Sequence, residues 1–360
     1  MSESLFDRIE LLARKHPLMA KAVACFSYYT LPLFPEKNKK LDLLIDEYRD
    51  PAKITAGMRR RYKKDLLSSH LVNGISLRQY FIHGFEFLNS KGRERFLGEF
   101  FKEYMIELSN DNKDAGAVFK DKYKTYQKFR PFYNRVIIPV EKENIEELHS
   151  FAENNEKFVI KVSDGTFGVG VMFYDSNKAE EKPDELFSRL IGDTEKKYIV
   201  EELITQAPEM MRLHPSSVNT VRFVTVLQKD DSVRHLFSFL RIGSGGGIID
   251  NASSGGYAAE IDMKTGVVIS EACREDLTRL VYHPDTGVKI VGLEIPKWDE
   301  LLLLVDELAR VVKEQKYVGW DLAYTENGWV MVEGNDRAMV TAVQMCRKEG
   351  IREAFIQSLN

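Results

Sequence analysis

The spacing of apolar residues divides the chain into two parts. In the first third, apolar positions recur at helical spacing, as in residues 76–88 and 94–108, and runs typical of strands are few. The polar stretch SNDNKDAG at residues 109–116 combines turn formers with charge, so it is the best candidate for a linker. We therefore predict a mainly helical N-terminal region over residues 1–115 and a second domain over residues 116–360.

Strands and helices alternate in the second domain, where β-branched runs predict strands and amphipathic stretches predict helices. The expected elements are a strand at 135–140, a helix near 143–154, a strand, loop and strand over 157–175, a helix near 183–191, strands at 197–204, 219–228, 233–242, 257–262 and 266–270, a helix at 298–314, and a hairpin with strands at 317–324 and 328–333. This order predicts an α+β fold with subdomains at 116–205 and 206–360.

The composition of the chain limits its number of domains, its partners and its compartment. With 360 residues and 44% hydrophobic content, the chain can bury about three quarters of its unfolded surface, enough for one large or two ordinary domains. The 51 basic and 55 acidic residues give a net charge of −4, so we expect no nucleic-acid partner. Cys25, Cys273 and Cys346 are far apart and odd in number, which favours a reducing cytoplasm over a disulfide framework. The N-terminus also lacks the pattern of a secretory signal.

The most apolar stretch, residues 16–34, contains Lys21 and two prolines, so we do not expect it to span a membrane. One interpretation is a buried helix. The other is a docking surface for a membrane-bound partner or for the bilayer interface, assisted by the basic run MRRRYKK at residues 58–64. The second interpretation would place the protein at the inner face of the membrane.

Candidate metal ligands lie in the C-terminal hairpin YVGWDLAYTENGWVMVEGN. The tight TENG turn predicts that Asp321 and Glu333 face the same side, with Asn335 two residues further on. Carboxylate and amide oxygens are the ligands that Mg²⁺ prefers, and Mg²⁺ usually arrives with nucleotide phosphates. The alternative is that these acidic residues are simply solvated.

A glycine-rich loop lies between two predicted strands in KFVIKVSDGTFGVGVMFYD. The first strand ends near Lys161, and Gly165, Gly168 and Gly170 follow in the loop. Glycine allows backbone N–H groups to approach an anion closely, so the loop can form a lid over phosphates. Because a strand follows the loop, neither the P-loop nor the Rossmann fingerprint fits. An ordinary flexible hairpin with a solvated lysine is the alternative.

Two further segments complete the pattern. The strand YIVEELI ends in Glu201 and Glu202, whose backbone can meet an adenine edge and whose carboxylates can reach ribose hydroxyls. Before the glycine loop, Asp121 and Lys122 are predicted to begin an amphipathic helix.

In this order, the four segments resemble the ATP-grasp superfamily over roughly residues 117–345. The resemblance implies that Lys122 and Lys161 bind ATP phosphates, that adenine meets a hinge at Glu201, Glu202 and Leu203, and that Asp321, Glu333 and Asn335 hold magnesium. Four further runs, at 214–225, 250–257, 283–298 and 318–335, resemble the sugar-transfer-associated ATP-grasp group, which is similar to alpha-L-glutamate ligase-related proteins and is associated with cell-surface polysaccharide biosynthesis.

Several polar residues are candidates for the substrate side of the site. Arg222 alternates with Val221 and Phe223, so we expect its side chain to point away from theirs as a cation for carboxylate or acyl-phosphate oxygens; a surface arginine is the alternative. Gln206 and Asn219 are candidates for binding ribose or substrate. Asn251, Gly255 and Gly256 either line the acceptor cleft or form a glycine-rich turn. His214 and His283 each precede a proline and are expected to be structural.

The resemblance implies an ATP-grasp fold, in which two α+β subdomains clasp ATP, and a requirement for ATP with Mg²⁺, with two ions and Mn²⁺ as a possible substitute. It also implies an ADP-forming carboxylate–amine ligase that acts through an acyl phosphate on a small-molecule or glycan-linked acceptor. In that reaction Lys161 and Arg222 would be the catalytic residues. A kinase acting on a sugar or polyol hydroxyl is one alternative. A nucleotide-binding scaffold docked to a membrane-associated glycan assembly complex is another.

Overall fold

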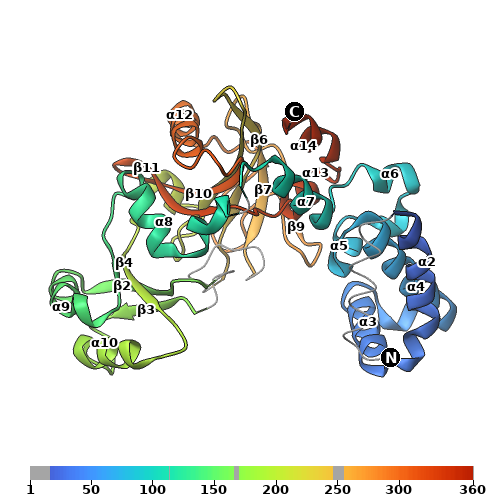
Figure 1. The fold of residues 1–360 in the computed structure, drawn as a ribbon, viewed down its shortest axis with the longest axis horizontal. Coiled ribbons are helices and arrows are strands. Elements are labelled where there is room, and N and C mark those ends of the chain that lie inside the picture. The colour runs from blue at the N-terminus through green and yellow to red at the C-terminus, as the bar shows by residue number, and fades with distance from the viewer. Residues whose placement is uncertain (1–16, 113, 166–169, 246–254, 360) are drawn as a thin grey trace. The chain divides into compact units, whose positions relative to one another are not determined.

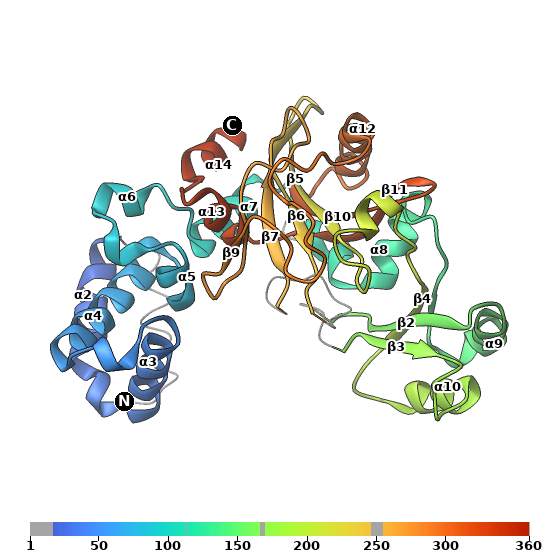
Figure 2. The ribbon, with the colours of Figure 1, turned by 180° about the vertical axis from the view of Figure 1, so that it is seen from behind.

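The computed structural model describes residues 17–112, 114–165, 170–245 and 255–359. The chain divides into two compact units (Figures 1 and 2). The first comprises Met1–Ser109, Glu275–Thr278 and Met339–Asn360, and the second comprises Asn110–Arg274 and Arg279–Ala338. A helical N-terminal region followed by mixed helices and antiparallel sheets confirms the predicted fold class. The boundary between residues 115 and 116 stays a prediction.

Helices form the first unit. Those that the structure describes are α2 (Pro17–Thr30), α3 (Pro35–Tyr48), α4 (Ala56–Asn73), α5 (Leu77–Ile82), α6 (Ser90–Glu94), α7 (Glu99–Ser109), α13 (Thr341–Arg347) and α14 (Arg352–Ser358), with short 3₁₀ turns at Leu31–Leu33, Pro51–Lys53 and Phe85–Phe87. Among the described residues, no helix is both long and apolar enough to cross a bilayer.

Two predicted helices of this unit are shorter than expected. The helix predicted at 76–88 ends at Ile82, because Gly84 adopts a left-handed φ of +64°. The helix predicted at 94–108 begins only at Glu99. Gly98 packs against the end of α4, where a Cβ atom would lie 2.2 Å from the Asn73 carbonyl oxygen. Both breaks therefore occur where the backbone requires a glycine.

The C-terminal helices are joined to the N-terminal ones by buried amides. The Gln344 side chain accepts a hydrogen bond from the Leu97 amide at 2.7 Å and donates one to the Leu97 carbonyl oxygen at 3.1 Å. Gln79 donates to the Thr341 hydroxyl at 2.6 Å. These contacts connect residues that are far apart in the sequence.

The second unit contains a small antiparallel sheet in the order β1-β4-β2-β3. Its strands are β1 (Ile137–Pro139), β2 (Lys157–Val162), β3 (Met172–Asp175) and β4 (Tyr198–Glu202), and its helices are α9 (Ile145–Asn154) and α10 (Pro183–Gly192). Phe158 from β2 and Phe187 from α10 are fully buried in one core cluster with Leu148 from α9. Helix α8 (Lys122–Phe129) precedes this sheet, after a 3₁₀ turn at Ala115–Lys120.

A larger antiparallel sheet in the same unit has the order β11-β10-β5-β6-β7-β8-β9. The strands are β5 (Thr220–Leu227), β6 (Val233–Ile242), β7 (Tyr257–Ile261), β8 (Ala272–Cys273), β9 (Arg279–Leu280), β10 (Tyr317–Thr325) and β11 (Gly328–Asn335), and the helices are α11 (Pro208–Met211) and α12 (Trp298–Ala309). The predicted C-terminal hairpin is confirmed, with Thr325 opposite Gly328 at its turn.

Two expectations for this sheet are wrong. Residues 266–270 form no strand and make only isolated bridges, because Val268 bonds through its amide to the Leu293 carbonyl in a loop, at 2.8 Å. The helix predicted at 298–314 ends at Ala309. Its end is tightened by 3₁₀-type bonds, such as the one from the Val311 amide to the Leu308 carbonyl at 3.2 Å.

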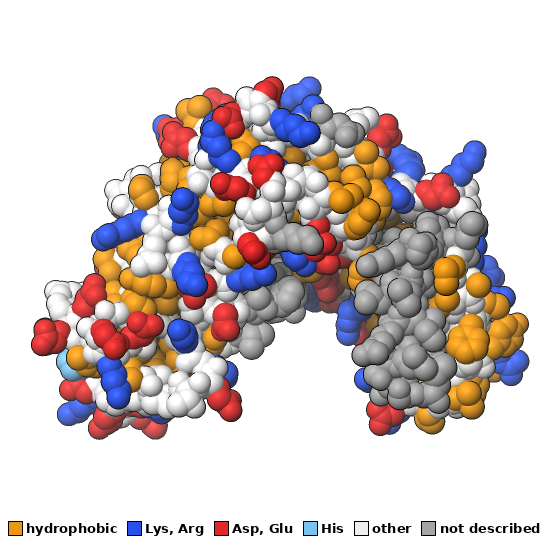
Figure 3. All heavy atoms as spheres, viewed as in Figure 1, with side chains coloured by type: hydrophobic (Ala, Val, Ile, Leu, Met, Phe, Trp, Pro, Cys, Tyr) orange, Lys and Arg blue, Asp and Glu red, His pale blue; other side chains and the backbone are white. Residues whose placement is uncertain are grey.

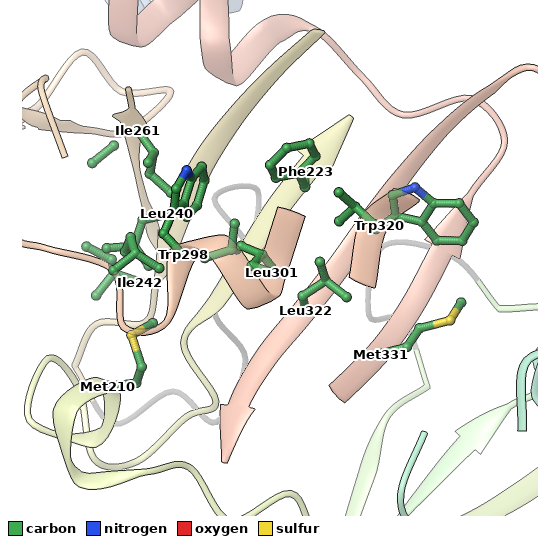
Figure 4. Packing of buried hydrophobic residues seen from close by; sticks show 14 of the residues in the cluster. Met210, Phe223, Leu240, Ile242, Ile261, Trp298, Leu301, Trp320, Leu322 and Met331 are labelled. Carbon is green, nitrogen blue, oxygen red and sulfur yellow. The ribbon is translucent and has the colours of Figure 1, made fainter. Parts of the chain in front are cut away.

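The large sheet has one apolar face, which forms the main core. Figure 4 shows Phe223, Leu240 and Leu322 from the strands with Trp298 and Leu301 from α12. The rings of Phe223 and Trp298 lie 5.8 Å apart between centroids. Because side chains alternate across a strand, the residues between these apolar positions project from the opposite face.

Candidate functional site

The opposite face of the large sheet carries a row of charged side chains. Asp321 on β10 lies opposite Glu333 on β11 and opposite Arg222 on β5. Directly paired residues project from the same face of a sheet, so these three side chains are neighbours. Val221 and Phe223, which flank Arg222, are buried in the apolar core. The alternation of the strands therefore separates the charged row from the core.

Two arginines hold Asp321. Arg222 donates through Nε to Oδ1 and through Nη2 to Oδ2, the latter at 2.7 Å, and Arg241 Nη1 lies 2.6 Å from Oδ2. The Asp321 side chain is only 5% exposed. Burial alone would raise the pKa of this carboxyl, but the charges of Arg222 and Arg241 outweigh burial and lower the pKa to about 2. Asp321 is therefore ionised at neutral pH.

Arg222 points away from Val221 and Phe223, as predicted from the alternation. Its side chain is 14% exposed, so the alternative of a surface arginine is wrong. Its role toward a substrate stays a prediction. Arg241 was missed by the sequence analysis. Alternation along β6 places it on the polar face, but no local signal shows that it reaches Asp321 two strands away.

Glu333 and Asn335 lie beside this cluster on β11. The Glu333 side chain is 40% exposed, and its Oε1 is 4.0 Å from Lys122 Nζ. Asn335 lies opposite Gly319, and its side-chain nitrogen is buried with no hydrogen-bond partner among the described residues. A buried polar group without a partner is unusual in a folded protein. This amide therefore marks a place where a polar ligand would complete the structure.

These three residues fit a Mg²⁺ ion that arrives with a nucleotide. Two carboxylates and an amide supply hard oxygen ligands. Asp321 Oδ1 accepts one arginine bond and keeps a lone pair for a metal ion, whereas Oδ2 already accepts from both arginines. In the part of the chain that the structure describes, no group of three or more His, Cys, Asp or Glu residues could hold a metal ion. Phosphate oxygens would have to complete the coordination, and the assignment of the three ligands stays a prediction.

The two predicted phosphate-binding lysines lie close together. Asp121 caps α8 by accepting from the Lys124 amide at 3.0 Å, and the Lys122 amide donates to the Ser163 carbonyl, just beyond β2, at 2.8 Å. Lys122 Nζ donates to the Gly165 carbonyl oxygen. The pKa of Lys122 is lowered, first by burial and then by the positive charge of Lys161, although Glu333 opposes the shift. Two neighbouring ammonium groups favour the binding of a polyanion.

Glu201 is a buried acidic centre instead of an exposed group at a strand end. Its Oε2 lies 2.6 Å from Lys161 Nζ, and its Oε1 accepts from Arg135 Nε at 2.6 Å. Burial would raise the pKa of Glu201, but the charges of Arg135 and Lys161 lower it to about 2. Arg135 also donates to the Met331 carbonyl at 2.7 Å, so it links β4 to β11. The sequence analysis missed Arg135, which stands alone before β1 with no motif around it.

The other predicted nucleotide-binding residues occupy the segment after β4. Glu202 accepts from the Val136 amide at 2.8 Å, and Leu203 is half-buried directly beyond the strand. Gln206 donates to the Ser217 carbonyl at 2.6 Å and accepts from the Asn219 amide at 2.7 Å. Asn219 is fully buried and donates to the Met210 and His214 carbonyls. In this structure Gln206 and Asn219 hold the segment together, and a role in binding ribose or substrate stays a prediction.

The glycine loop is described at its two ends. Gly165 donates its amide to the Val162 carbonyl at 3.1 Å. Gly170 has a φ of +77°, and a Cβ atom there would lie 2.7 Å from a Val162 methyl group, so this position requires glycine. Gly168 lies outside the described residues.

The predicted acceptor residues lie at one end of β7. Gly255 has a φ of +95°, and its carbonyl accepts from the Ser244 hydroxyl at 2.6 Å, while Gly256 is buried. Asn251 lies outside the described residues. His283 Nε2 lies 2.8 Å from the Gly243 carbonyl oxygen, and His214 Nε2 lies 2.9 Å from that of Gly245. Both histidines therefore support the chain after β6, which agrees with their expected structural role.

Comparison with known proteins identifies one matching family. The family model described as "Sugar-transfer associated ATP-grasp" matches residues 102–359, which is most of the chain. No curated protein matches the chain.

Solved structures with a similar fold include ATP-grasp ligase PsnB in complex with a minimal precursor, at 15% identity over 68% of this chain and 62% of that one, with a TM-score of 0.40. D-alanyl-alanine synthetase A from Vibrio cholerae O1 biovar eltor matches at 12% identity over 69% of this chain and 66% of that one, with a TM-score of 0.43. D-alanine–D-alanine ligase from Bacillus anthracis matches at 15% identity over 72% and 74% of the two chains, with a TM-score of 0.40. The alignment spans about three fifths of the length of PsnB. TM-scores this low say nothing about the function of this chain.

Proposed function

Since the chain belongs to the sugar-transfer associated ATP-grasp family, we propose that it is an ATP-dependent ligase that joins a carboxylate to an amine through an acyl phosphate. The proposal rests on one observation above all. Lys122 Nζ lies 4.0 Å from Glu333, and the Lys122 amide bonds at 2.8 Å to the carbonyl of Ser163, two residues beyond Lys161. Cations from α8 and β2 thus gather beside the predicted metal ligands on β11, as binding of a nucleoside triphosphate would require.

In the first step, a carboxylate oxygen of the acceptor attacks the γ-phosphorus of ATP. The bond from that phosphorus to the ADP oxygen breaks, and an acyl phosphate and ADP form. Charge shifts toward ADP during this transfer, and fixed cations stabilise it without reorganising. Lys122 and Lys161 would bind the phosphates. Arg222 would bind acceptor oxygens, because its planar guanidinium suits a carboxylate or an acyl phosphate.

In the second step, an amine attacks the acyl carbon. The bond from that carbon to the phosphate oxygen breaks, phosphate leaves, and the proton of the amine passes to solvent. Asp321, Glu333 and Asn335 would hold Mg²⁺, which neutralises charge on the phosphate oxygens when bound. The arginines on Asp321 keep its carboxylate ionised and fixed in position. The glycine loop between Gly165 and Gly170 would exclude water that would otherwise hydrolyse the acyl phosphate.

We place this reaction in the cytoplasm, in the biosynthesis of cell-surface polysaccharide or another glycoconjugate. The description of the family supports this setting, because it associates the domain with sugar transfer. The acceptor would then be a small molecule or a glycan-linked carboxylate. Three cysteines without disulfides agree with a reducing compartment.

ATP turnover in the presence of Mg²⁺ tests the proposal. The assay offers amino acids, uronic acids and neutral sugars, with and without hydroxylamine, and follows ADP, AMP and hydroxamate. Hydroxylamine traps an activated acyl group, so hydroxamate and ADP formed together would support the ligase. ADP with a phosphorylated acceptor and no hydroxamate would reject the ligase in favour of a kinase on the same site. AMP as the product would reject both.

Glu333→Gln separates either enzyme from a scaffold. The substitution keeps the shape of the side chain but removes the charge beside Lys122, so we expect turnover to fall at least about 100-fold. Glu326→Gln is the matched control, because Glu326 is exposed in the turn of the same hairpin. Equal turnover in the two variants would contradict the assigned site. If the wild-type protein binds ATP but turns over none of it, a scaffold is the better interpretation.

A further inference from the structure

Helix α2 exposes several apolar side chains at helical spacing. Met19 is 50% exposed, Phe26 47%, Tyr29 70% and Leu33, in the following turn, 74%. Their spacing of seven, three and four residues places them along one stripe of a helix. We name Met19, Phe26, Tyr29 and Leu33 the α2 stripe.

The other side of α2 is already buried. Ala20 and Ala24 form a small core cluster with Leu71 of α4. Among the described side chains of α2, Lys21 is the only charged one. A helix that is apolar on two sides usually has a second partner, because water on a continuous apolar stripe is costly. The α2 stripe is therefore an exposed apolar surface on which a further partner can bind.

Cations of two kinds lie in this part of the chain. Arg59 and Lys63 on α4 neutralise Asp42 and Asp46 of α3. A second set of exposed cations makes no ion pair within the residues that the structure describes: Lys21, Lys39, Lys40, Arg60, Arg61 and Lys64. Figure 3 shows blue side chains interspersed with orange ones on the helical unit.

Acids do not balance these cations. Between residues 19 and 75 the exposed acids are Glu36, Glu47 and Asp50. Glu47 pairs with Arg78 and Asp50 pairs with Lys53, so both are already engaged. This part of the unit consequently combines exposed apolar residues with a local excess of positive charge.

We propose that the α2 stripe and the exposed cations of α2, α3 and α4 together form a binding surface for an anionic lipid bilayer. A helix lying in the bilayer interface buries its apolar side among acyl chains and places cations among anionic headgroups. Tyr29 suits this boundary because its ring is apolar and its hydroxyl is polar. Lys21 can extend its stem along the apolar side and keep its ammonium group among the headgroups.

Vesicle flotation of the full chain tests this surface and requires no knowledge of the reaction. The probes are vesicles of phosphatidylcholine alone and of an equimolar mixture of phosphatidylcholine and phosphatidylglycerol. We expect flotation with the mixed vesicles only, and we expect it to weaken as salt is raised, because salt screens the attraction between cations and headgroups. Flotation that is equal on both vesicle types would overturn the role of charge and with it the proposal.

Paired variants locate the surface. Phe26→Ser with Leu33→Ser removes the apolar contribution, and Arg60→Gln with Lys64→Gln removes part of the charge; each pair should reduce vesicle affinity about tenfold or more. Leu303→Ser is the apolar control, because Leu303 is 67% exposed on α12 in the second unit. Lys297→Gln, also exposed in that unit, is the charge control. Unchanged thermal unfolding shows that each variant is folded.

Unchanged flotation of both paired variants would overturn the assignment. A dimer of the wild-type chain that the Phe26→Ser, Leu33→Ser pair converts to a monomer would overturn it in favour of a second copy of the chain as the partner. The proposal goes beyond the ligase function and does not rest on it, since flotation and ATP turnover are measured separately. A negative result in the flotation assay leaves the ligase proposal standing, and a negative result in the turnover assay leaves the bilayer proposal standing.

Discussion

Two arginines share the carboxylate of Asp321, and all three side chains are largely buried. We predict that Asp321→Asn lowers the free energy of unfolding by about 3–5 kcal/mol, because it leaves two buried guanidinium groups without a counter-charge. Urea denaturation followed by tryptophan fluorescence measures this change. ATP turnover should also fall, since the same substitution removes a predicted metal ligand.

Asp299→Asn is the matched control, because Asp299 is exposed in the first turn of α12. It should cost no more than about 1 kcal/mol through the lost interaction with the helix dipole. Equal losses in the two variants would show that the arginine pair does not stabilise the second unit. A stability loss at Asp321 with full turnover would remove this residue from the metal site while leaving its structural role.

Sequence patterns identify part of the site at this scale. Asp321 and Glu333 lie on adjacent strands of a hairpin, so a short-range turn signal is enough to pair them. The sequence did not predict the roles of Arg135 and Arg241, because each contacts a carboxylate that is far away in the sequence. Arg135 meets Glu201 over 66 positions of sequence, and Arg241 meets Asp321 over 80. An isolated arginine near a strand carries no local sign of such a contact.

At the scale of elements, the segment after β11 packs closely on Gly319 of β10. A Cβ atom there would lie 2.3 Å from the Ala338 Cβ and 3.3 Å from the Arg222 Cδ. We predict that Gly319→Ala costs about 1–3 kcal/mol of stability, because a well-packed site tolerates no added methyl group. It should also reduce turnover by displacing Arg222 from Asp321. Denaturant unfolding and an ATP turnover assay measure the two effects.

Gly192→Ala provides the comparison. Gly192 is the last residue of α10, its φ is not positive, and a Cβ atom there would meet nothing within 4 Å. This substitution should be neutral or slightly stabilising, because alanine favours a helix more than glycine does. If Gly319→Ala behaves like Gly192→Ala, the strands have room to adjust, and the tight packing around Arg222 is not required.

Elements with strong periodicity are predictable, and their ends are not. Helices α9 and α10 lie where the sequence predicts them. The helix predicted at 94–108 is cut short at Gly98, because that glycine packs against the backbone at the end of α4, which lies more than twenty residues earlier. Residues 266–270 look like a strand locally, yet their backbone bonds to a loop. In both cases a contact distant in sequence overrides the local pattern.

At the scale of the whole molecule, the two units should respond to acid in different pH ranges. Burial lowers the pKa of His83, in the helical unit, from 6.5 to about 3, so the stability it contributes is present above pH 6.5 and is lost as pH falls toward 3. Glu201 and Asp321, in the second unit, have pKa values lowered to about 2 from 4.5 and 3.8. The stability that these two carboxylates contribute is therefore lost only as the pH falls below their ordinary pKa values of 4.5 and 3.8.

Two spectroscopic probes can separate these responses. All three tryptophans, Trp298, Trp320 and Trp329, belong to the second unit, whereas far-UV circular dichroism also reports the helices of the first. Between pH 7 and about pH 5, the urea midpoint from circular dichroism should fall more than the midpoint from tryptophan fluorescence. His83→Leu should remove most of this difference. Identical pH dependence in the variant and the wild type would exclude His83 as the cause.

The sequence predicts a helical region and an α+β region, but it does not reveal that residues 339–360 belong with the former. Gln344 bonds to both polar backbone groups of Leu97, across 247 positions of sequence. Glutamine near a C-terminus carries no signal for such a contact. Only the folded chain brings these residues together.

The chain passes between the two units at four points, near residues 109, 274, 278 and 338. Neither unit is therefore encoded by one continuous stretch of gene. An expression clone that starts at residue 110 would carry the C-terminal helices without the helices that cover them, and one that stops there would lack both returning segments. Exchanging the helical unit between related proteins would require transplanting three separate coding segments at once, so recombination at a single crossover would be a poor route to new combinations of the two.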